Sequence, residues 1–104
     1  MLNEKQLEMA RHALGFPNKQ NMSNRISYYT GAGGDGYEEW LDMVAKGYAI
    51  RRTGPLWGGD DMFHMTLKGA LLARGPKEHI SRDGAEMMRQ LEEKYPAPAP
   101  AHSS

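Results

Sequence analysis

The chain has 104 residues, with 13 basic and 13 acidic side chains, no cysteine and a 39% share of hydrophobic residues. This length fits a single domain with one modest core. The zero net charge argues against the basic surface typical of nucleic-acid-binding domains, and the lack of cysteine excludes disulfides and thiolate chemistry.

No segment suggests secretion or membrane insertion. Polar residues 3–6 interrupt the N-terminal segment, so it lacks the apolar centre of a signal peptide. No apolar run approaches the length of a membrane span. We therefore expect a soluble, cytoplasmic protein.

The first predicted helix begins after Asn3 and ends at Gly15, with Pro17 blocking its continuation. Asn3 and Gln6 have the spacing of a capping box. The apolar face of this helix is expected to contain Leu7, Met9, Ala10, Ala13 and Leu14.

A short strand is predicted over residues 25–29, followed by a flexible glycine-rich loop over residues 31–36. The next helix, residues 37–46, is the best-defined element and ends at Gly47, and Asp35 is expected to cap it. Its buried face is expected to contain Tyr37, Trp40, Leu41 and Val44, continuing to Tyr48.

A hairpin is predicted next, with strands over residues 48–52 and 62–65 joined by a long glycine-rich loop. Thr66 is expected to cap a third helix, and Ser81 a fourth. The inward-facing residues predicted for these helices are Leu67, Ala70 and Leu71 in the third, and Met87, Met88 and Leu91 in the fourth.

These elements predict one α+β domain over residues 1–95, with three or four helices around a two- or three-stranded antiparallel sheet. Residues 96–104 alternate proline with alanine and offer little apolar area to bury. We predict that this segment is a disordered tail.

The hairpin region resembles the wing of the MarR-type winged-helix repressors. In that family a helix leads through a glycine into a strand, an acidic wing and a returning strand. The matching residues are Gly47, Tyr48, Ile50, Arg51, Asp61, Met65, Thr66 and Gly69. The resemblance implies a winged-helix-like domain that binds DNA. This chain departs from the family in the acidic exposed face of helix 37–46.

The chain is also similar to small phage- and prophage-encoded proteins of proteobacteria. The residues that carry this similarity are Leu7 to Gly15, Asn24, Arg25, the tyrosine pair 28–29, Tyr37, Trp40, Gly58 to Asp60, and Thr66. The resemblance implies a phage-related origin and no known activity.

Three residue patterns in the sequence bear on enzymatic chemistry. Residues 31–36 match a dinucleotide-binding glycine pattern, but no strong apolar strand is predicted before them, and Asp35, Glu38 and Glu39 would repel phosphate. Asp60, Asp61 and His64 resemble metal ligands, yet adjacent strand residues point to opposite faces. No serine has the strand-to-helix turn of a nucleophile. We expect no enzymatic activity, no cofactor and no metal site.

The candidate interaction surface consists of Tyr28, Tyr29, Arg51, Arg52 and Trp57. Loop aromatics of this kind suit protein contacts. The favoured function is a non-enzymatic, phage-type protein-interaction module. Its partner is an unknown protein, and a homodimer is one form this could take. The alternative is a winged-helix DNA-binding transcriptional regulator that uses hairpin 48–65, which the balanced charge disfavours.

Overall fold

A computed structural model of the chain describes residues 1–53 and 61–96. Its elements, in chain order, are α1 (Glu4–Leu14), β1 (Ser27–Thr30), α2 (Tyr37–Ala45), β2 (Ala49–Arg52), β3 (Asp61–Met65), α3 (Leu67–Ala73) and α4 (Arg82–Lys94). The predicted small α+β domain with an antiparallel sheet is confirmed. The predicted loop at residues 54–60, which contains Trp57, and the predicted tail from residue 97 onward lie outside the described residues.

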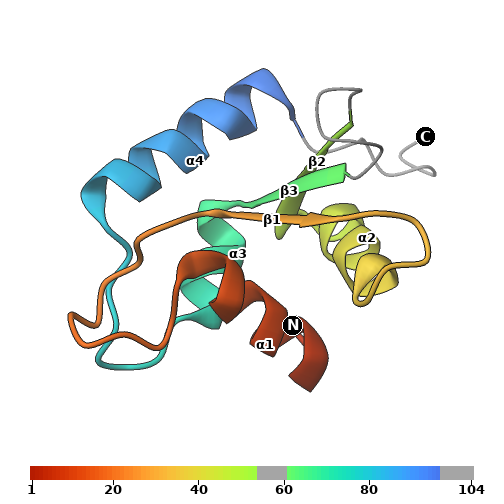
Figure 1. Cartoon of the computed structure of the whole chain (residues 1–104). Helices are drawn as coiled ribbons and strands as arrows, with labels where there is room; N and C mark the ends of the chain where they lie inside the picture. Colours follow the sequence, from red (N-terminus) through yellow and green to blue (C-terminus); the bar gives the residue numbers. More distant parts are fainter. Residues whose placement is uncertain (54–60, 97–104) are drawn as a thin grey trace.

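The three strands form one antiparallel sheet in the order β1-β3-β2, so the last strand lies in the middle. In Figure 1, α1, α2 and α3 lie on one side of this sheet, while α4 runs along the other. Cross-strand partners share a face of a sheet, and neighbours along a strand alternate between faces. The register therefore fixes which side chains meet which helices.

Aromatic rings fill the space between the sheet and α1 and α2. The Trp40 ring stacks on Tyr28 of β1, with the ring centroids 5.5 Å apart, and on Phe63 of β3 at 5.4 Å. Trp40 and Phe63 are fully buried. The buried position predicted for Trp40 is confirmed, and Met43 adds a fully buried side chain that the predicted helix face did not include.

The predicted helix starts at Asn3, Thr66 and Ser81 are confirmed. Each of these side chains accepts a hydrogen bond from a backbone N–H in the first turn of its helix, and Asn3 forms the full capping box with Gln6. The cap predicted for α2 was wrong. Gly36 occupies that position without a side-chain cap, and the Asp35 carboxylate lies 3.1 Å from Lys5 of α1.

Three predictions of a buried face were wrong: Leu7 of α1 is 36% exposed, and Leu71 and Met87 are each about half exposed. The buried face of α3 consists of Gly69, Ala70 and Ala73. A Cβ atom at Gly69 would lie 2.2 Å from the backbone oxygen of Tyr48, so α3 approaches the start of β2 too closely for a large side chain. On α4, Met88 faces the core and its neighbour Met87 does not.

Over residues 1–53 and 61–96, no helix combines the length and the apolar character needed to cross a bilayer.

Candidate interaction surface

The sheet register divides the predicted interaction residues between two faces. Tyr28 and Arg51 are both cross-strand partners of Phe63, on the face toward α1 and α2. Tyr29 and Arg52 are both partners of Met62, on the face toward α4. Trp57 lies outside the described residues. The four described residues therefore form two pairs on opposite faces of the sheet.

Arg51 belongs to a closed polar cluster. Its Nε donates to Asp61 Oδ2 at 2.8 Å, and its Nη2 donates to the Tyr37 hydroxyl at 2.9 Å. That hydroxyl donates in turn to Asp61 Oδ2 at 2.7 Å, which raises the pKa of Tyr37 above its usual value. The cluster ties β2 and β3 to the start of α2 and satisfies the Arg51 charge within the domain.

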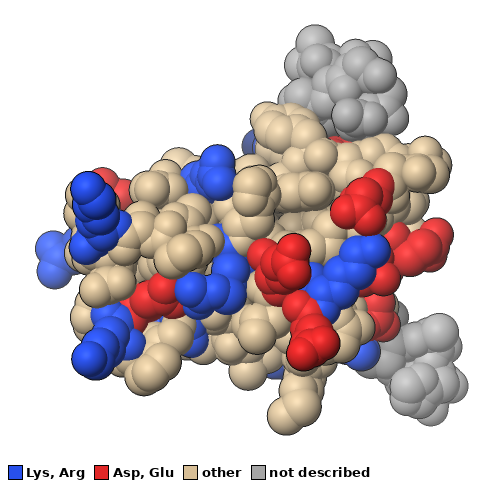
Figure 2. Space-filling model, turned by 60° about the horizontal axis from the view of Figure 1, so that its bottom comes forward, with Lys and Arg blue, Asp and Glu red and all other residues tan. Residues whose placement is uncertain are grey.

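Arg52 is engaged on the other face. Its guanidinium lies 5.0 Å from the centroid of the Tyr95 ring, at the end of α4. The two adjacent arginines therefore do not form a common basic patch. On the face shown in Figure 2, which carries α1, basic and acidic side chains are interspersed.

A helix-turn-helix requires two consecutive helices joined by a short turn. Every residue between β1 and β2 is described, and α2 is the one helix there. This segment therefore contains no helix-turn-helix. The first turn of α2 carries Glu38 and Glu39, which would repel a phosphate backbone.

The outer edge of β1 has backbone groups that no residue in 1–53 or 61–96 pairs with. The Met65 N–H donates to the Ile26 carbonyl, so Ile26, Tyr28 and Thr30 direct their backbone groups toward β3. Ser27 and Tyr29 consequently direct their N–H and C=O groups away from the sheet. No described residue hydrogen-bonds to these outward groups, and Tyr29 is 53% exposed. This edge is available to another strand.

The aromatic contacts hold this edge in place. On its outer side the Tyr28 ring meets the edge of the His12 ring, with the centroids 5.6 Å apart, and on its inner side it stacks on Trp40. Tyr28 is therefore fixed between α1 and the core. Its neighbour Tyr29 projects toward solvent from the opposite face.

A serine–histidine contact lies one residue away from Tyr28. The Ser27 hydroxyl is 2.8 Å from His64 Nδ1. Burial, together with the nearby Arg52 charge, lowers the pKa of His64 to about 4. His64 Nε2 is buried and has no hydrogen-bond partner in the described part of the chain, so no acid orients the ring as in a catalytic triad.

The glycine-rich loop 31–36 does not have the setting of a dinucleotide site. The predicted short strand, β1, does precede it. However, β3 separates β1 from β2, so no pair of adjacent parallel strands flanks the loop. Asp61 and His64 lie on opposite faces of β3, and no potential metal-binding group of three or more His, Cys, Asp or Glu residues occurs in residues 1–53 and 61–96.

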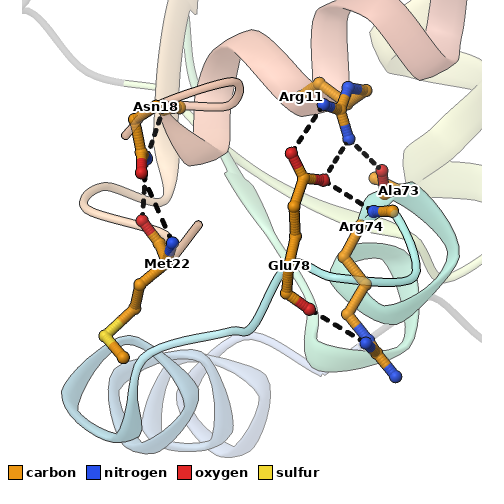
Figure 3. A network of polar contacts seen from close by, with 8 residues as sticks. Arg11, Asn18, Met22, Ala73, Arg74 and Glu78 are labelled. Carbon is orange, nitrogen blue, oxygen red and sulfur yellow. Dashed lines mark hydrogen bonds and ion pairs between the residues drawn. The ribbon is translucent and has the colours of Figure 1, made fainter. Parts of the chain in front are cut away.

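A second polar cluster, which no sequence pattern predicts, joins α1 to the segment before α4 (Figure 3). Arg11 Nη2 donates to Glu78 Oε2 at 2.8 Å, and Arg11 Nη1 donates to the Ala73 carbonyl at 3.0 Å. The contact with Arg11 lowers the pKa of Glu78. The Gly75 N–H also donates to this carboxylate, so the cluster is internally satisfied and structural.

No protein-family model matches the chain, and neither the curated proteins nor the solved structures gave a significant match. The resemblances to winged-helix repressors and to phage proteins therefore stay predictions.

Proposed function

We propose that this chain is a non-enzymatic, cytoplasmic interaction module that binds an extended segment of a partner protein by adding it as a strand to the edge of β1. A phage-type accessory role is the biological setting that the sequence resemblance suggests. In strand addition, backbone hydrogen bonds supply affinity and side chains on alternate faces supply specificity.

The observation that carries the proposal is the outer edge of β1. Ser27 and Tyr29 each direct an N–H and a C=O away from the sheet without a described partner. An antiparallel segment can form two hydrogen bonds with each of these residues. The exposed Tyr29 ring adds a large apolar contact, of the kind that interfaces favour.

Two observations favour this function over DNA binding by the hairpin. Arg51 is held by Asp61 and Tyr37, and Arg52 lies over Tyr95 on the other face. Phosphate binding by these arginines would have to displace contacts that they already make.

The test begins with selection of linear peptides from a random library on the immobilised wild-type protein. The selected peptides are then titrated into ¹⁵N-labelled protein. We expect the largest amide shifts at Ser27 and Tyr29. The outcome that contradicts the proposal is a set of shifts centred elsewhere, or no selected peptide at all.

Two variants of Tyr29 provide a matched control. Tyr29→Pro removes an outward N–H that β3 does not use, so the sheet should persist while affinity falls by roughly tenfold. Tyr29→Thr also loses the ring but keeps that N–H, so it should bind more tightly than Tyr29→Pro. Melting curves of both variants verify folding. A labelled DNA duplex is titrated in parallel, and tight binding at physiological salt would favour the regulator instead.

A further inference from the structure

The geometry of β1 places one side chain of an added strand next to Tyr28. Tyr28 directs its backbone groups toward β3, so it would sit between the two hydrogen-bonded positions Ser27 and Tyr29. The residue opposite Tyr28 would belong to a non-hydrogen-bonded pair, in which Cα atoms are about 4.5 Å apart and side chains are close. Its side chain would point to the face that carries α1.

A cavity of about 210 Å³ lies at that position, lined by Glu8, Met9, His12, Tyr28 and Asp35. Its walls come from α1, from β1 and from the loop before α2. Met9 and the Tyr28 ring offer apolar surface for the stem of a long side chain. The carboxylates of Glu8 and Asp35 belong to exposed residues at its rim.

The charge around this cavity is negative. Glu8, Asp35 and the neighbouring Glu39 contribute three carboxylates, against the Lys5 ammonium and the Arg25 guanidinium, which donates to the His12 carbonyl. Lys5 Nζ lies 3.1 Å from Asp35 and 3.8 Å from Glu39. These carboxylates raise the pKa of Lys5, with the hydrogen bond to Asp35 as the largest cause. An incoming cation would find Glu8 with no ion pair among the described residues.

We propose that the partner segment carries an arginine or lysine opposite Tyr28, with its aliphatic stem on Met9 and Tyr28 and its charge beside Glu8 and Asp35. This inference rests on strand addition at β1 as the proposed function. Arginine is the better fit, because its planar guanidinium can stack on an aromatic ring and bind a carboxylate through two N–H groups.

The probes are two capped nine-residue peptides in which valine and threonine flank the central residue. One has arginine at the centre, and the other has citrulline, its neutral isostere. Affinities are measured from amide shifts of ¹⁵N-labelled protein at low and at physiological salt. We expect the arginine peptide to bind roughly fivefold more tightly, with a smaller difference at higher salt.

Variants at the rim separate the charge effect from the strand pairing. The Glu8→Gln/Asp35→Asn double variant should abolish the preference for arginine and leave the affinity for the citrulline peptide unchanged. Lys5→Gln should increase the preference, because it removes the cation that already neutralises Asp35.

The failures of the two proposals are distinguishable. Equal binding of both peptides, with shifts at Ser27 and Tyr29, would overturn the cationic preference and leave strand addition in place. Tighter binding of citrulline would do the same. If neither peptide shifts these two amides, both proposals are overturned.

Discussion

The two outer strands of the sheet, β1 and β2, have four residues each but differ in the exposure of their free edges. The outward backbone groups of β2 belong to Ala49 and Arg51, because the Thr66 N–H donates to the Tyr48 carbonyl. Ala49 is 3% exposed, and α2 packs against β2. A cavity of about 250 Å³ beside β2 is lined by residues of both α2 and α4, so helices flank this strand.

The edge of β1 has no comparable cover in the described part of the chain. Ser27 and Tyr28 are half-buried, and Tyr29 is exposed. Natural sheets usually protect their edges with charge, covering elements or short strands, since an open edge can pair with other chains. In this domain, β2 has a covering helix and an internally paired arginine, while no element of residues 1–53 and 61–96 covers the edge of β1 in this way. This difference makes β1 the edge to test for binding.

The largest expected effect comes from removing the ring that joins β1 to the core. Trp40→Ala deletes the stacking partner of both Tyr28 and Phe63 and should lower the free energy of unfolding by roughly 3–5 kcal/mol. Chemical denaturation measures the change. Leu41→Ala, at a partly buried position on the same helix, is the control and should cost less. A Trp40→Ala protein as stable as the wild type would show that β1 is held by other contacts.

The next effect is a loss of stability in acid, which we expect from His64 in the central strand β3. His64 of the central strand pairs with Ser27 of β1 and Ile50 of β2. Its pKa is about 4 in the folded protein, against about 6.5 when unfolded. The unfolded chain therefore binds more protons in this window, and the free energy of unfolding should fall by at most about 3 kcal/mol as the pH drops from 6.5 to 4.

The histidine contribution can be isolated by substitution. His64→Gln should flatten this part of the stability profile, measured by denaturation at several pH values. Glu78 also contributes, because its pKa is lowered in the folded protein. Its part of the free energy of unfolding is lost at lower pH, as its carboxylate becomes protonated. An unchanged slope between pH 6.5 and 5 in His64→Gln would assign the acid sensitivity to other groups.

A smaller effect is expected from opening the cluster at the end of β2. Asp61→Asn removes the charge that accepts from Arg51 and Tyr37 and should cost about 1–2 kcal/mol, as for hydrogen bonds to charged groups. The pKa of Tyr37 should fall toward its usual value, which ultraviolet titration of the tyrosines can detect. Peptide binding at β1 should not change, because the substitution keeps the backbone of β3 that pairs with β1; a tenfold loss would show that the cluster and the edge of β1 are coupled.

The smallest effect on stability is expected at the open edge itself. Tyr29→Lys should change the free energy of unfolding by less than about 0.5 kcal/mol, because the side chain is exposed. The matched substitution Ile50→Lys, at a position on β2 that is 5% exposed, should be severely destabilising, because it buries a charge. If the two variants lose similar amounts of unfolding free energy, the edges of β1 and β2 do not differ in exposure.

Local rules were sufficient to predict much of the fold. The caps at Asn3, Thr66 and Ser81 and the buried Trp40 depend on short-range spacing, and all are present. The outward direction of Leu71 could not be predicted, because it depends on how closely α3 approaches the carbonyl of Tyr48. That approach is a tertiary contact with no local sequence signal.

The candidate site was less predictable than the fold. The sequence indicated Tyr28 and Tyr29 as contact residues, but not that their strand lies at an open edge, because strand order depends on the pairing of β1 with β3 across more than 30 positions. The cavity beside Tyr28 combines residues of α1 and the loop before α2. Residues from separate elements come together in this way through tertiary packing, and their spacing in the sequence does not predict it.

The contact between Arg11 and Glu78 has a consequence for the order in which the chain acquires its structure. The two residues are 67 positions apart, and their bond fixes α1 against the segment that follows α3. Contacts between distant positions form slowly, because a long loop must close first. During translation, α1 leaves the ribosome well before its glutamate partner is made. This contact of α1 therefore cannot form until the described elements from β1 to α3, which lie between the two residues in the chain, have been synthesised.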